Sequence, residues 1–107
     1  MAYVKVCSAD LLGPGGMAGF YVDGVEILIV RDRDGVFRAF DGICPHQDSP
    51  LAEGYYDGAI ITCATHGWMF NAETGRGVNP PNCKIAAYPL KIEGNEILVD
   101  PDTEIKS

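Results

Sequence analysis

The sequence predicts an all-β protein that forms one small domain. Short apolar runs of strand length recur along the chain, and thirteen glycines and seven prolines supply many turns between them. No segment of helix length keeps the 3.6-residue period of an amphipathic helix, so we expect no long helix. A chain of 107 residues is long enough for one domain with a modest core.

The N-terminal part predicts two β-hairpins. Its alternating and apolar runs place strands at 3–7, 17–22, 25–31 and 36–40. A glycine-rich loop separates the first strand from the second. The sequence Asp32-Arg33-Asp34-Gly35 is a strong hairpin signal, because its glycine accepts the positive φ that tight turns require.

The sequence changes character from residue 41 to about 83. Gly, Pro and polar residues dominate there, interrupted by the short apolar runs 59–61 and 68–70. Strand patterns return at 84–88, 90–93 and 96–99, and we expect the polar tail 100–107 to fray. The predicted fold is a small antiparallel β-sandwich or partly open barrel over residues 1–107, with a loop-rich subdomain at about 41–83 inserted between its early and late strands.

The charge of the chain limits its partners. A net charge of −7 and a pI near 4.5 argue against nucleic acid and anionic membranes. The acidity serves either solubility or docking onto basic patches of partner proteins. No apolar run approaches the ~20 residues of a membrane span, and the N-terminus lacks the pattern of a secretory signal. We therefore expect a cytoplasmic protein.

The inserted region carries a metal-ligand pattern. It contains Cys44-Pro45-His46 and, further along, Cys63-Ala64-Thr65-His66, and these include the only two histidines of the chain. Each half offers one thiolate and one imidazole at close spacing, and Pro45 stiffens the first loop. Two loops of this kind could clamp one site from opposite sides. A [2Fe–2S] cluster with two thiolates on one iron and two neutral imidazoles on the other requires this ligand set.

These residues resemble the Rieske motif. Phe70, Thr74-Gly75 and the Pro80-Pro81 loop also fall where Rieske domains have a strand, a turn and a proline-containing loop over the cluster. The resemblance implies the Rieske fold, one [2Fe–2S] cluster held by Cys44, His46, Cys63 and His66, and an electron carrier that is not an enzyme by itself.

A structural zinc site is the main alternative, because Cys₂His₂ is also a zinc ligand set. Zinc sites more often begin with C-x₂₋₄-C, a spacing that this chain lacks in the motif. The zinc alternative would make the protein an interaction module without a redox role. Cys7 and Cys83 remain outside the ligand set. We expect Cys7 to be a small buried side chain and Cys83 to pack beneath the proline-containing loop. The sequence leaves a disulfide between them open.

The residues around the motif resemble a narrower group, the ferredoxins of diiron monooxygenases that oxidise toluene or alkenes. The similar stretches are Cys44-Pro45-His46-Gln47, residues 51–54, His66-x-Trp68-x-Phe70-Asn71 and residues 77–80. This resemblance implies an NADH-dependent flavin reductase as electron donor and a diiron hydroxylase as acceptor. The alternatives are a ferredoxin of an arene dioxygenase system and an accessory Rieske-like subunit of another reductase.

Three positions predict a low reduction potential. Respiratory Rieske proteins resemble one another in an extra cysteine in each ligand loop, a Ser two residues after the second His, and a Tyr two beyond that. This chain has Thr65 where the second extra Cys would fall and no Cys at 47–49, and it has Trp68 and Phe70 at the Ser and Tyr positions. The resemblance therefore implies that the disulfide and both hydroxyl donors to the cluster sulfurs are absent. With fewer donors the reduced cluster is less stabilised. Trp68 either shields the cluster or contacts a partner protein.

Overall fold

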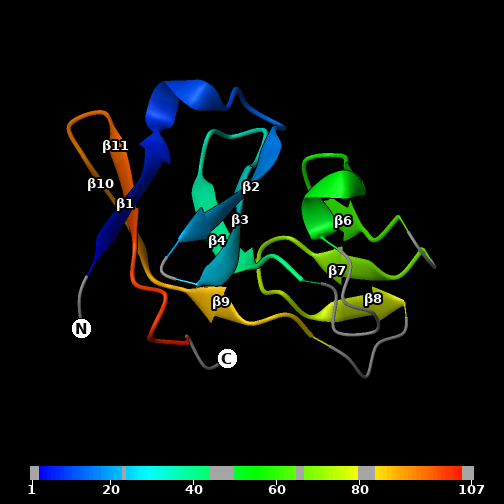
Figure 1. The fold of residues 1–107 in the computed structure, drawn as a ribbon. Coiled ribbons are helices and arrows are strands. Elements are labelled where there is room, and N and C mark those ends of the chain that lie inside the picture. The colour runs from blue at the N-terminus through cyan, green and yellow to red at the C-terminus, as the bar shows by residue number, and fades with distance from the viewer. Residues whose placement is uncertain (1–2, 23, 44–49, 65–66, 80–83, 105–107) are drawn as a thin grey trace.

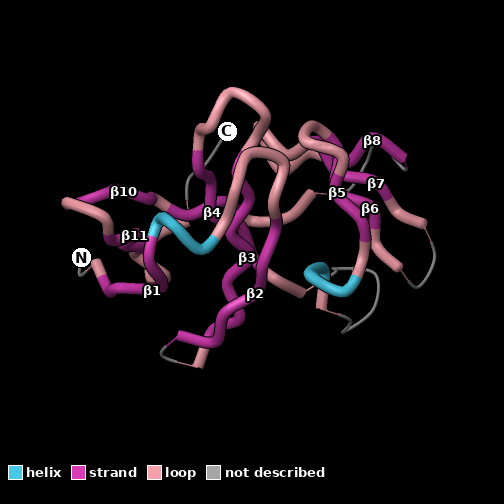
Figure 2. The backbone as a smooth tube through the Cα atoms, turned by 90° about the horizontal axis from the view of Figure 1, so that it is seen from above, coloured by secondary structure: helices cyan, strands magenta, loops and turns pink. Residues whose placement is uncertain are grey.

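The structure, a computed structural model, describes residues 3–22, 24–43, 50–64, 67–79 and 84–104 of the chain. In this part the chain forms three antiparallel sheets. Figures 1 and 2 show the second sheet lying between the first and the third. The all-β prediction is therefore confirmed. Where a sandwich or partly open barrel was expected, the structure has three small sheets side by side.

The strands are assigned to the sheets as follows. The first sheet has the order β1-β11-β10, from Val4–Ser8, Glu96–Val99 and Leu90–Glu93. The second has the order β2-β3-β4-β9, from Met17–Val22, Val25–Arg31, Phe37–Asp41 and Ala87–Tyr88. The third has the order β5-β6-β7-β8, from Tyr55–Tyr56, Ile60–Thr62, Met69–Asn71 and Gly77–Asn79.

Helical structure is limited to two short 3₁₀ turns in the described residues. These are η1 (Ala9–Leu11) and η2 (Leu51–Glu53). No helix in this part of the chain is long and apolar enough to cross a membrane.

Strand β3 is buried on both of its faces. The four residues from Ile27 to Val30 are each 0% exposed. Because side chains alternate along a strand, Leu28 and Val30 pack into a core shared with the third sheet, and Ile27 and Ile29 pack into a core shared with the first. The continuous apolar run of this strand thus follows from its position between two layers.

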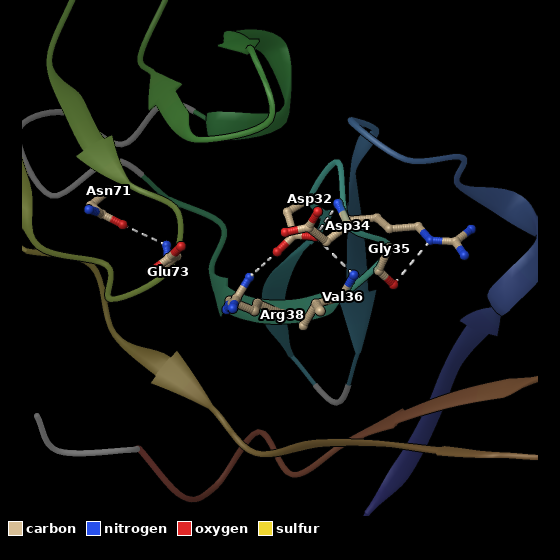
Figure 3. A network of polar contacts seen from close by, with 8 residues as sticks. Asp32, Asp34, Gly35, Val36, Arg38, Asn71 and Glu73 are labelled. Atoms are coloured by element: carbon tan, nitrogen blue, oxygen red, sulfur yellow. Dashed lines mark hydrogen bonds and ion pairs between the residues drawn. The ribbon is translucent and has the colours of Figure 1, made fainter.

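The turn between β3 and β4 is held by its own polar groups. The Asp32 carboxylate accepts hydrogen bonds from the N–H groups of Asp34 (2.9 Å) and Val36 (3.0 Å), and it pairs with the Arg38 guanidinium at 2.7 Å (Figure 3). The same hydrogen bonds, that from Arg38 first, hold the pKa of Asp32 below its ordinary value. The predicted hairpin turn is confirmed by these contacts.

Two expectations about the C-terminal part are wrong. The run 84–88 was expected as one strand, but only Ala87–Tyr88 pairs in the second sheet, and Lys84 forms an isolated bridge with Arg76 instead. The tail was expected to fray from residue 100, yet Asp100 is 0% exposed. Its carboxylate accepts hydrogen bonds from the Asp102 N–H (3.1 Å) and the Thr103 hydroxyl (2.9 Å), which order this part of the tail.

Candidate metal centre

Cys63 is the one predicted ligand that lies within the described residues; Cys44, His46 and His66 lie outside them. Cys63 directly follows β6 and is 2% exposed. Its N–H donates to the Trp68 carbonyl at 2.7 Å, and its own carbonyl accepts from the Gly67 N–H at 3.0 Å. Gly67 adopts a φ of +71°, which favours glycine. These bonds close the base of the segment that carries the second half of the motif.

The segment that carries Cys44 and His46 is also closed at its base. Ile43 and Pro50, on either side of it, form an isolated antiparallel bridge. The Leu51 N–H adds a hydrogen bond of 2.8 Å to the Gly42 carbonyl. The chain therefore enters and leaves this half of the motif at neighbouring points.

The bases of the two segments are in contact. A Cβ atom placed on Gly54 would meet the Thr62 carbonyl oxygen and would lie 3.1 Å from the Ala64 nitrogen, so only glycine fits there without displacing the backbone. Leu51 and Cys63 also belong to one buried core. The residues that flank both halves of the motif thus converge on one end of the third sheet, which fits a single centre held from two sides.

The proline-containing segment starts from the same end of the sheet. Asn79, the last residue of β8, pairs with Met69, which follows Trp68. After this segment, Lys84 forms an antiparallel bridge with Arg76, which brings the chain back beside the third sheet. Pro80 and Pro81 themselves lie outside the described residues.

Trp68 and Phe70 occupy apolar surroundings. Trp68 is partly buried and packs against the core that contains Cys63, and Phe70 is 0% exposed within that core. This packing of Trp68 fits the shielding role. Neither side chain carries a hydroxyl group that could donate to a cluster sulfur.

Cys7 is separate from the candidate centre. It lies in β1, in the core between the first and second sheets, and is 8% exposed. It is therefore a small buried side chain, as expected, and this burial raises the pKa of its thiol. Cys83 lies outside the described residues. Within the described ranges no group of three His, Cys, Asp or Glu side chains forms a rival metal site.

The sequence did not indicate the role of Gly54. No local pattern in the sequence indicates that Gly54 would lie against the backbone of Thr62. Pairing of β5 with β6 is what brings the two backbones together.

Comparison with known proteins shows the family of the chain. The Rieske [2Fe-2S] domain family matches residues 2–89. The chain is 46% identical over 99 residues to the ferredoxin component of the alkene monooxygenase system of Xanthobacter autotrophicus, covering 91% of this chain and 80% of that protein. It is 36% identical over 102 residues to the biphenyl dioxygenase ferredoxin subunit of Pseudomonas sp. (strain KKS102), covering 94% and 93%.

A solved structure shares the whole fold. A chain of the complex of reduced oxygenase and oxidised ferredoxin in carbazole 1,9a-dioxygenase superposes with a TM-score of 0.87 at 27% identity, covering 97% of each chain. This shared fold, the family match and the ferredoxin relatives favour an iron–sulfur cluster over zinc as the group that the Cys and His pattern binds. The chain belongs to the Rieske [2Fe–2S] domain family and is a ferredoxin, which carries electrons on one [2Fe–2S] cluster.

Proposed function

We propose that the chain carries single electrons from an NADH-dependent flavin reductase to the diiron hydroxylase of a multicomponent hydrocarbon monooxygenase. It has no catalytic reaction of its own in this role, and it acts in the cytoplasm. The observation that carries the proposal is the 46% identity to an alkene monooxygenase ferredoxin across 91% of the chain.

We assign the cluster to Cys44, His46, Cys63 and His66. The two thiolates would hold the inner iron and the two imidazoles would hold the outer iron. The burial of Cys63, 2% exposed, suits an inner ligand. The contact between Gly54 and the Thr62–Ala64 backbone supports one centre shared by both halves of the motif. Residues 41–83 would then form the cluster-binding part of a single domain over 1–107.

The cluster, when bound, supplies one-electron chemistry at a potential in the Rieske range. Backbone hydrogen bonds tie the Cys63 main chain to Trp68 and Gly67, which fixes the point from which its side chain would reach the cluster.

A ferredoxin of an arene dioxygenase system is the second candidate. The 36% identity to a biphenyl dioxygenase ferredoxin supports it. The identity to the alkene monooxygenase ferredoxin is ten percentage points higher (46 against 36), and the residues flanking the motif resemble the monooxygenase group.

Reconstitution distinguishes the two candidates. The purified ferredoxin is mixed with NADH, a flavin reductase, and the oxygenase component of either the Xanthobacter autotrophicus alkene monooxygenase or a biphenyl dioxygenase. Product formation that depends on the ferredoxin is expected with the monooxygenase. Faster turnover with the dioxygenase would reverse the assignment, and no electron transfer to either oxygenase would refute the proposed function.

A further inference from the structure

The third sheet presents a row of side chains on the face opposite its core. Ile61 and Phe70 face inward and are 0% exposed. Because side chains alternate along a strand, their neighbours Thr62 and Met69 point to the other face. The pairings Tyr55↔Thr62 and Thr62↔Met69 align these residues across β5, β6 and β7. We call Tyr55, Thr62 and Met69 the outer row.

The outer row lies beside the candidate metal centre. Thr62 precedes Cys63, and Met69 follows Trp68. The row therefore borders the end of the third sheet from which the segments of the motif start. This sheet forms one extremity of the molecule, away from the first sheet (Figures 1 and 2).

Large apolar side chains are exposed along this row. Tyr55 is 71% exposed and Met69 is 37% exposed. Val78, 46% exposed, adds a third apolar side chain on the adjacent strand β8. Tyr and Met are enriched at protein interfaces, and adjacent exposed apolar side chains mark contact surfaces more often than single ones.

The charges near the outer row indicate the surface chemistry of a partner that would fit it. Glu53, exposed at the end of η2, precedes β5 and the row. None of the basic residues in the described part lies on η2, β5, β6 or β7. Arg33 contacts the turn between β5 and β6, and Arg76 and Lys84 lie at the bridge beyond β7, so all three lie at the other end of the sheet from the row. With a net charge of −7 on the chain, this surface complements a partner face that is apolar at its centre and basic at its rim.

We propose that the outer row is the docking surface for the oxygenase component. The proposal rests on the proposed function, and it is supported by the position of the row next to Cys63 and by its apolar and acidic character. A solved ferredoxin of this fold is named in a complex with its oxygenase, which shows that direct contact between such proteins occurs in a relative. The oxygenase would cover Tyr55 and Met69 and so come close to the cluster.

The test uses a double variant, Tyr55→Ser with Met69→Ser, and a matched control, Tyr21→Ser. Tyr21 is 75% exposed but lies in β2 of the second sheet. Steady-state turnover of the alkene monooxygenase oxygenase is measured against the concentration of each reduced ferredoxin. We expect the double variant to raise KM for the ferredoxin at least tenfold with kcat changed less than twofold, and Tyr21→Ser to match the unsubstituted protein.

Two further arms separate docking from other effects. Reduction of the ferredoxin by its reductase is measured for each variant, and the double variant should differ there by less than twofold. The visible spectrum and iron content show that the cluster is intact; if the double variant loses it, Tyr55→Ser alone serves, because its highly exposed side chain contributes little to the core. Tyr55→Lys should weaken docking more than Tyr55→Ser, since it places a positive charge against the apolar centre and near the basic rim of the partner face.

An unchanged KM for the double variant would overturn the proposal, as would an effect equal to that of Tyr21→Ser or one confined to the reductase step. In each of these outcomes the unsubstituted protein still supports turnover. Failure of the proposed function itself is different, because there the unsubstituted protein delivers no electrons to the oxygenase.

Discussion

The guanidinium group of Arg33 holds the turn that follows β5 in the third sheet. Its Nη2 donates a hydrogen bond of 2.6 Å to the Asp57 carbonyl oxygen. Arg33 belongs to the turn between β3 and β4, so this bond joins the second sheet to the third. Gly58, with a φ of +97°, lies under the same side chain, and a Cβ there would come within 2.7 Å of Arg33 Nε and 2.8 Å of its Cγ.

The contact predicts a non-additive pair of substitutions. Arg33→Ala should lower the free energy of unfolding by about 1 kcal/mol through the lost hydrogen bond. Gly58→Ala should cost about 2 kcal/mol, because it adds the cost of a positive φ and also displaces Arg33. The double variant should then resemble Gly58→Ala alone. Urea unfolding of the four proteins checks this, and a double variant that costs the sum of the two single changes would show that the residues are independent.

Gly54 predicts a link between backbone packing and cluster binding. Gly54→Ala forces a methyl group against the Thr62 carbonyl, immediately before Cys63. We expect the purified variant to contain less than half the iron of the unsubstituted protein. Gly13→Ala is the control, because a Cβ there has no neighbour within 4 Å. Equal iron in both variants would mean that the Gly54 contact does not position Cys63.

Asp32 predicts a pH dependence of stability. Its pKa is held below the ordinary value of 3.8, first by the hydrogen bond from Arg38 and then by those from Val36 and Asp34. A carboxyl group with a lower pKa in the folded state stabilises the fold above pH 3.8 and loses this contribution as the pH falls through the folded pKa. Asp32→Asn should therefore lower the urea midpoint at pH 7, and its difference from the unsubstituted protein should shrink below pH 3.8.

Asp34→Asn is the matched control for this titration, because Asp34 lies in the same turn and is exposed. Its urea midpoint should match that of the unsubstituted protein both at pH 7 and below pH 3.8. A difference between Asp32→Asn and the unsubstituted protein that stays constant down to pH 3 would contradict the stated role of the Arg38 and backbone hydrogen bonds.

The reduction potential should lie near the lower end of the Rieske range, about −150 mV. Trp68 and Phe70 pack in apolar surroundings and offer no hydroxyl donor. Fewer hydrogen bonds to the sulfurs stabilise the more anionic, reduced cluster less. Redox titration followed by visible absorption measures the midpoint, and a value well above zero would contradict this account.

Strands β2, β3 and β4 of the second sheet were predictable because each leaves a local signal, whereas β9 of the same sheet is shorter than expected. The strands at 17–22 and 25–31 have the predicted bounds, since the apolar run of β3 and the Asp32–Gly35 turn are encoded in neighbouring residues. The division into three sheets was not predictable, because it depends on pairing between distant segments. Strand β1 pairs with β11 near the other end of the sequence, and no local pattern indicates that register.

The candidate site likewise has features that the sequence predicts and features that depend on pairing between distant segments. Its ligand types and spacing are local, so Cys44, His46, Cys63 and His66 stand out in the sequence. The contact of Gly54 with the Thr62 carbonyl and the outer row through Tyr55 arise from strand pairing. The ordered tail at Asp100 was missed for the same reason, because its burial depends on the Pro89 carbonyl that accepts its N–H at 3.1 Å.

The central claim is that the chain holds one [2Fe–2S] cluster through Cys63 and the other motif residues. Chemical analysis of iron and acid-labile sulfide, together with the EPR spectrum of the reduced protein, tests it most directly. The unsubstituted protein and Cys7→Ser should each contain two iron and two sulfide per chain, because Cys7 is a buried residue of another core. Cys63→Ser should lose the cluster. A colourless unsubstituted protein that binds zinc and no sulfide, or a Cys63→Ser variant with full cluster content, would contradict the account.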